Sequence, residues 1–313
     1  MSSAEDNLEA DDEGGEASDN NCCASCDRAE LDDVKLKPCD GCDLVRYCSD
    51  ECKEDHRSEH KAKCKERAAE LRDEILFKQP EGTHLGDCPI CSLPLQIEHK
   101  KTTSFSCCSK VICKGCSYAL FLQQEGSNVQ PVCPFCRHPE YTSSEEDQKN
   151  LMKRVAANDP GALCVLGYRH LTEGEYDRAL KYWTKAAEMG DAMTHFNLFI
   201  IYSQGQGVEK DETKKIFHLE EAAILGHPHA RYNLGCHEWR SGRIDRAVKH
   251  YIISATLGHD ESIQAVKGLY KDGYVSKEDF AAALRAHHVA VNAMKSPTRR
   301  EAAEFLEVLV SHR

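Results

Sequence analysis

The sequence predicts two small cysteine-rich fingers in its first half and an all-α solenoid of helix-turn-helix repeats in its second half. Two observations lead to this prediction. Sixteen of the 18 cysteines lie within residues 22–136. Beyond them, segments that close with a glycine and start a new helix recur 36 and then 32 residues apart, which indicates a repeated helical unit. The closing glycines are Gly190, Gly226 and Gly258.

Length and composition limit the class of protein. A chain of 313 residues can hold two or three domains, and 41% apolar residues is normal for a folded protein. No apolar run is long enough to span a membrane. The start, MSSAEDNLEADDEGGEASDN, has no apolar core of a secretory signal and no arginines of a transit peptide. We therefore expect an intracellular protein, of cytoplasm or nucleus, where clustered cysteines bind metal more often than they form disulfides.

Charge is concentrated at the start of the chain. Residues 1–20 carry eight acidic residues and no basic one, so two thirds of the net charge of −12 lies there. Such a segment buries too little apolar surface to order itself, and we expect a disordered, solubilising acidic tail. The acidic balance also argues against a nucleic-acid partner, which would need a basic face.

The first cysteine cluster contains four ligand pairs, in CCASCDRAELDDVKLKPCDGCDLVRYCSDECKEDHRSEHKAKC. A CxxC loop directs two thiolates at one tetrahedral zinc, and two ligands four residues apart on a helix share one face. Eight ligands suffice for two closed, structural zinc sites. The pairs are Cys23 with Cys26, Cys39 with Cys42, Cys48 with Cys52, and His60 with Cys64.

These pairs, the aromatic residue in RYCSDEC and the closing HxxxC resemble the MYND finger over residues 23–64. The resemblance implies interleaved ligands, with Cys22 and His56 outside both sites. It also implies a module that binds peptides, some of them proline-containing; the alternative is a purely structural finger. No SET-like sequence follows, so methyltransferase activity is not expected. One zinc would be held by Cys23, Cys26, Cys48 and Cys52, and the other by Cys39, Cys42, His60 and Cys64.

Between the clusters, KAKCKERAAELRDEILFKQP is rich in strong helix formers. This pattern predicts a connecting helix that runs to about Lys78 and is stopped by Pro80.

The second cluster opens with CPIC and closes with CPFCR. Two CxxC pairs, a central pair and the final CPxCR resemble a RING finger over residues 88–138. The resemblance implies a second cross-brace, in which the closing pair needs two ligands from the middle of the segment. One zinc would be held by Cys88, Cys91, Cys113 and Cys116, and the other by Cys133, Cys136 and two further ligands.

The common RING pattern has a cysteine five residues before the central pair and a histidine three residues before it. Here those positions hold Cys108 and Lys110, and a lysine cannot replace the histidine as a zinc ligand. Cys107 is the nearest thiol, so we expect adjacent Cys107 and Cys108 to bind the same metal. His99 or His138 is the alternative fourth ligand. A redox dithiol at the central pair is disfavoured, because matched pairs flank it.

The RING resemblance implies a ubiquitin ligase that orients a ubiquitin-charged conjugating enzyme and performs no chemistry of its own. Ile90 and Pro134, inside the first and last CxxC, would contact the conjugating enzyme. Arg137 lies where a cation bridges that enzyme and ubiquitin, and its planar fork suits two carbonyls. In the helix CSYALFLQQ, Leu120 and Phe121 are expected in the core. The alternative is a RING-shaped scaffold without ligase activity.

The second half resembles Sel-1-like repeats, relatives of the tetratricopeptide repeat, from about residue 159 to 284. Three units are clear, the middle one with a loop four residues longer, and a degenerate fourth caps the stack. In that unit Ser276 and Asp279 match a helix-start pattern. Such solenoids bind proteins.

Five histidines of the repeats are expected to be ordinary turn and surface residues. Cys164 and Cys236 are expected to be small, buried apolar residues. The histidines are His227, His229, His237, His250 and His259. Small alanines let paired helices approach closely; they are Ala186, Ala187, Ala222, Ala223 and Ala255.

The sequence therefore predicts small zinc-stabilised cross-brace fingers, MYND and RING-like, plus an all-α solenoid of helix-turn-helix repeats. We expect four Zn²⁺ ions and an intracellular ubiquitin ligase whose repeats and MYND finger recruit substrate. The alternatives are a non-catalytic adaptor and, from family habit alone, a transcriptional cofactor. The expected segments are an acidic tail (1–20), MYND finger (21–66), connector (67–84), RING-type finger (85–140), linker helix (141–158) and repeats with a cap (159–313).

Overall fold

A computed structural model describes residues 22–30, 34–124, 130–139 and 143–311. The acidic residues 1–20, for which a disordered tail is expected, lie outside this part of the chain. The chain divides into two compact units, residues 1–75 and 76–313, which are described separately. Within the described residues, no helix is long and apolar enough to cross a membrane.

The first unit is a small finger with a two-stranded antiparallel sheet, β1 (Lys37–Pro38) and β2 (Arg46–Tyr47). Two helices follow, α1 (Asp50–Asp55) and α2 (Arg57–Leu76). The connecting helix therefore ends two residues before the expected Lys78. The buried core is Cys23, Leu36, Cys39, Cys42 and Tyr47, so most of it is made of expected metal ligands. A finger with so little apolar core depends on its metal for stability.

The second finger, residues 85–139, opens the second unit. It contains a 3₁₀ turn η1 (His99–Lys101), an antiparallel pair β3 (Thr102–Ser104) and β4 (Val111–Cys113), and helix α3 (Lys114–Gln124). Its core is equally small and consists of Cys88, Leu95, Ile112 and Cys113.

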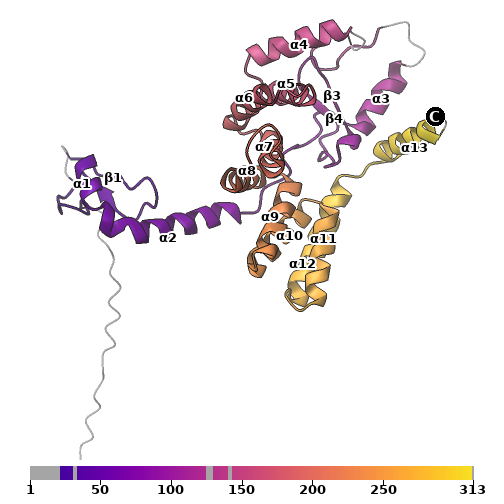
Figure 1. Ribbon diagram of the computed structural model, residues 1–313. Helices are drawn as coiled ribbons and strands as arrows, with labels where there is room; N and C mark the ends of the chain where they lie inside the picture. Colours follow the sequence, from indigo (N-terminus) through magenta and orange to yellow (C-terminus); the bar gives the residue numbers. More distant parts are fainter. Residues whose placement is uncertain (1–21, 31–33, 125–129, 140–142, 312–313) are drawn as a thin grey trace, which may run out of the picture. The chain divides into compact units, whose positions relative to one another are not determined.

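Helices in antiparallel pairs form the rest of the second unit (Figure 1). The loop from α7 to α8 spans residues 205–211, whereas the corresponding loops span 173–175 and 241–243, so the expected four-residue excess is confirmed. Ser276 caps α12 as expected, accepting a hydrogen bond from the N–H of Asp279. The helices are α4 (Ser144–Ala156), α5 (Pro160–Thr172), α6 (Tyr176–Glu188), α7 (Ala192–Gln204), α8 (Glu212–Ile224), α9 (Pro228–Arg240), α10 (Ile244–Thr256), α11 (Asp260–Lys271), α12 (Lys277–Ala293) and α13 (Pro297–Ser311).

Each repeat ends in the same turn because its closing glycine is left-handed. Gly190 has φ 80°, a conformation that L side chains rarely adopt. The N–H of the next residue, Asp191, donates to the carbonyl of Ala186 and closes the turn. The Asp191 carboxylate then accepts from the N–H of Thr194 and starts α7. The periodic glycines of the sequence therefore mark the junctions between repeats.

Small residues also set the distance between paired helices. A Cβ at Gly167 of α5 would lie 2.4 Å from the Trp183 ring of α6, and one at Gly235 of α9 would lie 2.6 Å from Tyr251 of α10. In these two pairs the aromatic ring of the second helix therefore packs directly on the backbone of the first. The small alanines expected at these interfaces are all buried: Ala186, Ala187, Ala222, Ala223 and Ala255.

A segment that precedes the second finger packs against the repeats. Leu76 is 1% exposed and belongs to the core that α8 and α9 form through Leu219 and Leu234. The buried guanidinium of Arg231 on α9 donates to the Leu76 carbonyl. Further along, the N–H of His84 donates to the carbonyl of Gly226 (3.0 Å). Residues 76–84, the docked segment, are thus part of the solenoid rather than a free linker.

Phe77 of the docked segment covers His250 of α10, with 4.7 Å between ring centroids. His250 is fully buried, and neither of its ring nitrogens has a hydrogen-bond partner among the described residues. Burial, with smaller contributions from Arg231 and Arg246, lowers the pKa of His250 from 6.5 to about 3.

This burial predicts acid sensitivity of the repeats. Below pH 6.5 the unfolded chain binds a proton at His250 that the folded chain does not, so stability falls as the pH drops from about 6.5 towards 3. We expect a loss of about 2 kcal/mol between pH 7 and pH 5 from this residue. Denaturant unfolding of the wild type and a His250→Leu variant at both pH values measures it. Zinc release affects both proteins alike, so equal pH dependence in the two would contradict the assignment.

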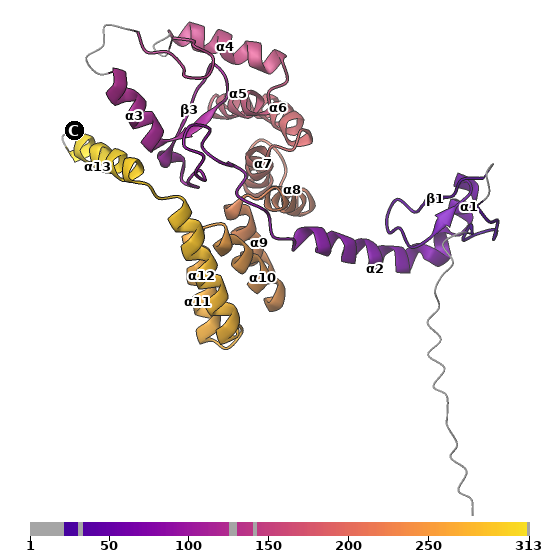
Figure 2. The same cartoon turned by 180° about the vertical axis from the view of Figure 1, so that it is seen from behind.

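Helix α13 returns to the second finger and lies beside α3 in both views (Figures 1 and 2). Phe305 of α13 packs on Tyr118 and Phe121 of α3, with ring centroids 5.0 and 6.0 Å apart. A Cβ at Gly115 would lie 2.9 Å from the backbone of Arg299, so only glycine permits this approach. The second finger and the end of the solenoid therefore share an interface.

Candidate metal centres

Four clusters of candidate ligands converge, with all ligand atoms of each cluster within 4.8 Å of one another. Two lie in the first finger and two in the second. In each finger the first and third ligand pairs along the chain form one cluster, and the second and fourth pairs form the other, which is the cross-brace arrangement. The clusters are Cys23, Cys26, Cys48 and Cys52; Cys39, Cys42, His60 and Cys64; Cys88, Cys91, Cys113 and Cys116; and Cys107, Cys108, Cys133 and Cys136.

The distances within each cluster fit zinc. Tetrahedral zinc with bonds of about 2.3 Å to sulfur holds its thiolates about 3.8 Å apart. The Sγ–Sγ distance is 3.5 Å for Cys26 and Cys48, and 3.8 Å for Cys91 and Cys113. All these thiols are free, and such separations are far too long for disulfides. Four sulfur or nitrogen donors leave no open position, so these residues would hold zinc in a structural role.

His60 completes the second cluster of the first finger from helix α2, where it shares one face with Cys64 as expected. Its Nε2 lies 3.1 Å from Cys42 Sγ, and the side chain is 7% exposed. Burial, with smaller contributions from neighbouring cations, lowers the pKa of His60, which favours the neutral imidazole that binds metal. His56 lies outside the cluster, and its Nδ1 is 3.1 Å from the Tyr47 hydroxyl.

Four of the five CxxC pairs form a loop that is followed by a residue in the left-handed conformation; the fifth, Cys113 with Cys116, lies at the start of α3. The N–H of the left-handed residue donates to the carbonyl of the first cysteine of the loop, as Ser92 does to Cys88 at 2.8 Å. This turn aims backbone N–H groups at the sulfurs, which suits thiolate ligands. Arg137, with φ 60°, follows the same rule at the last loop. Asp27 and Asp43 take this position after the two CxxC loops of the first finger.

The stretch FSCCS forms the same loop. Ser109 is left-handed, with φ 57°, and its N–H donates to the carbonyl of Phe105 at 3.0 Å. Phe105 therefore occupies the position of a first cysteine and Cys108 that of the second. Cys107 joins from within the loop, and its Sγ lies 3.3 Å from that of Cys136.

The structure thus brings both adjacent thiols into one cluster. Cys108 Sγ lies 3.6 Å from Cys133 Sγ. His138 points elsewhere, with its Nε2 2.8 Å from the side-chain amide of Asn150. The side chain of His99, the other alternative ligand, lies outside the described residues.

Backbone hydrogen bonds lower the pKa of the clustered thiols, whereas burial and neighbouring thiols raise it. Burial raises the pKa of Cys88, but backbone N–H groups, that of Cys113 first, outweigh burial and lower it to about 7. Hydrogen bonding with Cys26 and then Cys52 raises the pKa of Cys48 to about 12. A second thiolate beside the first is disfavoured, and a divalent cation at the centre removes this repulsion.

The first cluster of the second finger also contacts a residue far along the chain. Arg299 at the start of α13 is 7% exposed, and its guanidinium donates to Cys91 Sγ (3.5 Å) and to the carbonyl of Pro94 (2.7 Å). A fixed cation beside the thiolates offsets part of their negative charge. Sequence reasoning missed this contact, because Arg299 has no motif around it.

The expected contacts for a conjugating enzyme are accessible. Ile90 is 43% exposed, and Pro134 and Arg137 are exposed as well. Leu120 packs against the core of the finger, as expected, whereas Phe121 is 45% exposed. The two CxxC loops and α3 thus display apolar side chains on the surface of the finger.

The histidines of the repeats correct one expectation. Three of the five expected to be turn and surface residues are nearly fully buried: His227, His250 and His259. They serve the packing between repeats, and His227 also caps α9. Among the described residues, none of the five belongs to a metal-binding cluster. Cys164 and Cys236 are only partly buried.

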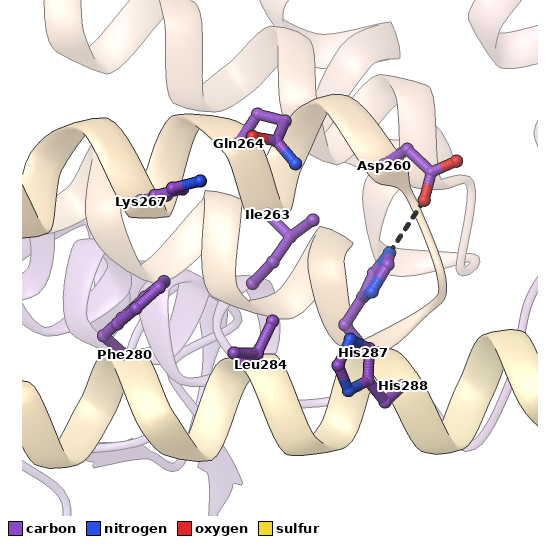
Figure 3. Close-up of a pocket in the computed structure, with 8 residues that line it drawn as sticks. All are labelled: Asp260, Ile263, Gln264, Lys267, Phe280, Leu284, His287 and His288. Atoms are coloured by element: carbon purple, nitrogen blue, oxygen red, sulfur yellow. Dashed lines mark hydrogen bonds and ion pairs between the residues drawn. The ribbon is translucent and has the colours of Figure 1, made fainter.

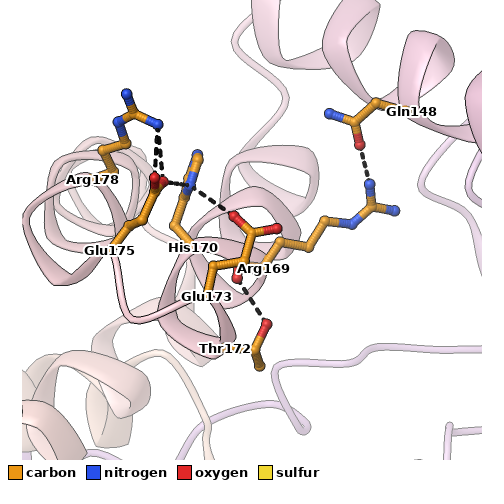
Figure 4. Close-up of polar contacts among 7 residues, drawn as sticks. All are labelled: Gln148, Arg169, His170, Thr172, Glu173, Glu175 and Arg178. Carbon is orange, nitrogen blue, oxygen red and sulfur yellow. Dashed lines mark hydrogen bonds and ion pairs between the residues drawn. The ribbon is translucent and has the colours of Figure 1, made fainter.

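Two other polar features were not expected from the sequence. At the turn from α5 to α6, His170 lies near Glu173 and Glu175, but Arg178 already binds Glu175 at 2.9 Å, so this is an ion-pair network (Figure 4). Between α11 and α12, a cavity of about 560 Å³ has an apolar wall and the pair His287 and Asp260, 3.0 Å apart, at one end (Figure 3).

The ligand clusters and the paired helices define the class of protein: a finger-containing protein with a solenoid of helical repeats. Comparison with known families specifies these modules. The MYND finger model matches residues 23–64, and the Sel1 repeat model matches residues 160–191, 192–227 and 228–259. The chain therefore contains a MYND finger and three Sel1 repeats, and the expected fold class is confirmed.

Individual relatives match short stretches. HcpC of Helicobacter pylori, named as a proposed beta-lactamase, is 41% identical over 56 residues, which is 18% of this chain and 19% of HcpC. ORF96 of Ostreid herpesvirus 1, named as a proposed RING finger protein, is 36% identical over 56 residues, 17% of this chain and 23% of that protein. The chain spans about a fifth of the length of these relatives.

Two solved structures are similar to part of the chain. A Sel1 repeat protein from Oxalobacter formigenes has a TM-score of 0.36 and 27% identity, over 39% of this chain and 98% of that one. The protective antigen c5321 of uropathogenic Escherichia coli, which has an SLR fold, has a TM-score of 0.39 and 26% identity, over 47% of this chain and 33% of that one.

Proposed function

We propose that the protein is a ubiquitin ligase whose second finger is a RING-type domain. The observation that supports it is the combination of two interleaved ligand clusters with Ile90 and Arg137 exposed beside them. The finger would bind a conjugating enzyme charged with ubiquitin and hold its thioester for attack, so that its contribution is positioning. Two zinc ions in each finger, four in all, would hold these surfaces in place.

The other modules would select the substrate. Sel1 repeats and MYND fingers are protein-interaction modules, and the MYND finger has a groove of about 740 Å³ beside its second ligand cluster. The lining of this groove includes Tyr47, Asp50 and Arg57, which suits a peptide with both apolar and charged groups. Because the ligand thiolates must stay reduced, we place the protein in the cytoplasm or nucleus.

A non-catalytic adaptor is the second candidate. Lys110 occupies the position of the usual RING histidine, and the docking of α13 on α3 gives the finger a structural role. In this case the MYND finger and the repeats would bring two proteins together and the second finger would only stabilise the chain.

Ubiquitin discharge distinguishes the two functions. The zinc-loaded protein is mixed with ubiquitin-charged conjugating enzymes and free lysine, alongside Ile90→Ala and Arg137→Ala variants. We expect the wild type to accelerate discharge and each substitution to remove most of the acceleration, roughly tenfold or more, because each deletes a contact made only in the positioned complex.

The control is Leu122→Ala, an exposed apolar residue of α3 that has no assigned contact with the conjugating enzyme. It should retain activity. No acceleration by the wild type across a broad panel of conjugating enzymes would favour the adaptor.

A further inference from the structure

A groove lies between the second finger and the start of α13. Its volume is about 630 Å³, within the roughly 300–1,000 Å³ of ligand-binding pockets. One wall comes from the finger and the other from the segment around the start of α13. Arg299 belongs to the second wall, where it donates to the carbonyl of Met294. It also donates to the carbonyl of Pro94 in the finger and so connects the two walls. The finger contributes Gln96, Lys100, Lys101 and Lys114, and the other wall Met294, Lys295, Ser296, Pro297, Arg299, Arg300, Ala303 and Leu306.

Six of these twelve lining residues are lysine or arginine, and none is acidic. Glu98 pairs with Lys101 at 2.6 Å, and Glu304 lies 3.9 Å from Arg300. The remaining three lysines have no carboxylate partner among the described residues; they are Lys100, Lys114 and Lys295. In a chain with a net charge of −12, this is a local reversal of sign.

The helix terminus adds to this positive potential. Ser296 Oγ accepts from the N–H of Arg299 at 3.2 Å and so caps α13, and both Ser296 and Pro297 line the groove. The positive end of the helix dipole is therefore directed at the same space as the lysines. The groove also has an apolar lining, called its apolar floor, which consists of Met294, Ala303 and Leu306, the last 38% exposed.

We propose that this basic groove binds an acidic segment of a partner protein that also carries aliphatic residues. Carboxylates would meet the lysines on both walls, and aliphatic side chains would cover the apolar floor. The lining holds no aromatic residue on which bases would stack, and the chain as a whole is acidic; both features favour a protein over a nucleic acid. This proposal does not depend on ligase activity, since Ile90, Pro134 and Arg137 do not line the groove.

The test measures binding by the full-length, zinc-loaded chain to a fluorescent peptide of alternating glutamate and leucine. The groove variant combines Lys100→Glu with Arg300→Glu, one exposed cation from each wall. The matched control combines Lys181→Glu with Lys271→Glu, exposed lysines of α6 and α11 that pair with no carboxylate in the described part of the chain, so both proteins change charge equally. We expect the groove variant to bind about tenfold more weakly than the wild type, and the control to stay within about twofold.

Further probes separate the contributions and the alternatives. Leu306→Ser should weaken binding of the glutamate–leucine peptide and leave binding of an all-glutamate peptide unchanged. Lys295→Glu alone, in the turn before α13, should weaken binding in the same direction if the double variant loses zinc. Equal affinities of the groove and control variants would overturn the proposal. Tighter binding of single-stranded DNA, lost in the groove variant, would also overturn it and assign the groove to nucleic acid.

Discussion

A Cys107→Ser variant will bind one zinc ion fewer per chain than the wild-type protein and will lose the fold of the second finger around Cys133 and Cys136. Cys107 Sγ lies 3.3 Å from Cys136 Sγ in a cluster of four thiols, and a serine hydroxyl is a poor ligand for zinc. A structural zinc site stabilises its fold by roughly 10–16 kcal/mol, far more than the small core of this finger can replace. Metal analysis and limited proteolysis of the finger measure the two effects.

The matched control is Cys22→Ser. Cys22 is also the neighbour of a ligand, Cys23, but it is exposed and lies outside all four clusters. Its replacement should leave the zinc content unchanged. If Cys107→Ser also keeps its full zinc content and its protease resistance, then Cys107 is not a ligand, and the fourth ligand must come from elsewhere in the finger.

A Leu76→Ala variant will destabilise the Sel1 repeats, although Leu76 lies outside all of them. Its side chain is 1% exposed and packs with Leu219 and Leu234, residues from two successive repeats. Truncating such a leucine costs about 2–5 kcal/mol, through lost apolar contact and the cavity that remains. Denaturant unfolding followed by helical circular dichroism measures the change.

The preceding residue provides the control. Ile75 lies on the same helix and is 53% exposed, so Ile75→Ala should change stability by no more than about 0.5 kcal/mol. Equal effects of the two substitutions would mean that the docked segment adds nothing to the stability of the repeats.

Spacing predicted the features of this protein that depend on local sequence. Four of the five CxxC pairs form the same tight loop, and the glycine period reflects a backbone conformation that other residues avoid, so both can be recognised without knowing the rest of the fold. The four-residue excess of the α7–α8 loop and the cap at Ser276 were also predictable, because both depend only on nearby residues.

Contacts between distant segments could not be predicted in this way. Nothing in the residues around Arg299 indicates that its guanidinium lies beside Cys91, and the helical pattern before Pro80 does not show that Leu76 and Phe77 belong to the core of the repeats. The buried histidines were misjudged because His250 has a polar side chain, and its burial depends on Phe77, a residue far away in the sequence.

The loop from Phe105 to Ser109 could have been recognised in the sequence, but cysteine spacing alone does not identify it. Phe105 has no thiol, yet the loop from Phe105 to Ser109 follows the hydrogen-bond pattern of a CxxC loop. A loop of this kind fixes where its second cysteine, Cys108, points, and leaves an inner position free to supply Cys107. If Cys107 binds zinc, the ligand that replaces the usual histidine comes from inside this one loop.

The contact between Arg299 and Cys91 also has a consequence for biosynthesis. The two residues are separated by 208 positions, so a ribosome completes the second finger well before it adds the residue that caps its first ligand cluster. At translation rates of about 5–20 residues per second, that interval lasts on the order of tens of seconds. During it the nascent finger lacks both the Arg299 cation beside Cys91 and the packing of α13 on α3, so this interface can form only after the repeats have been synthesised.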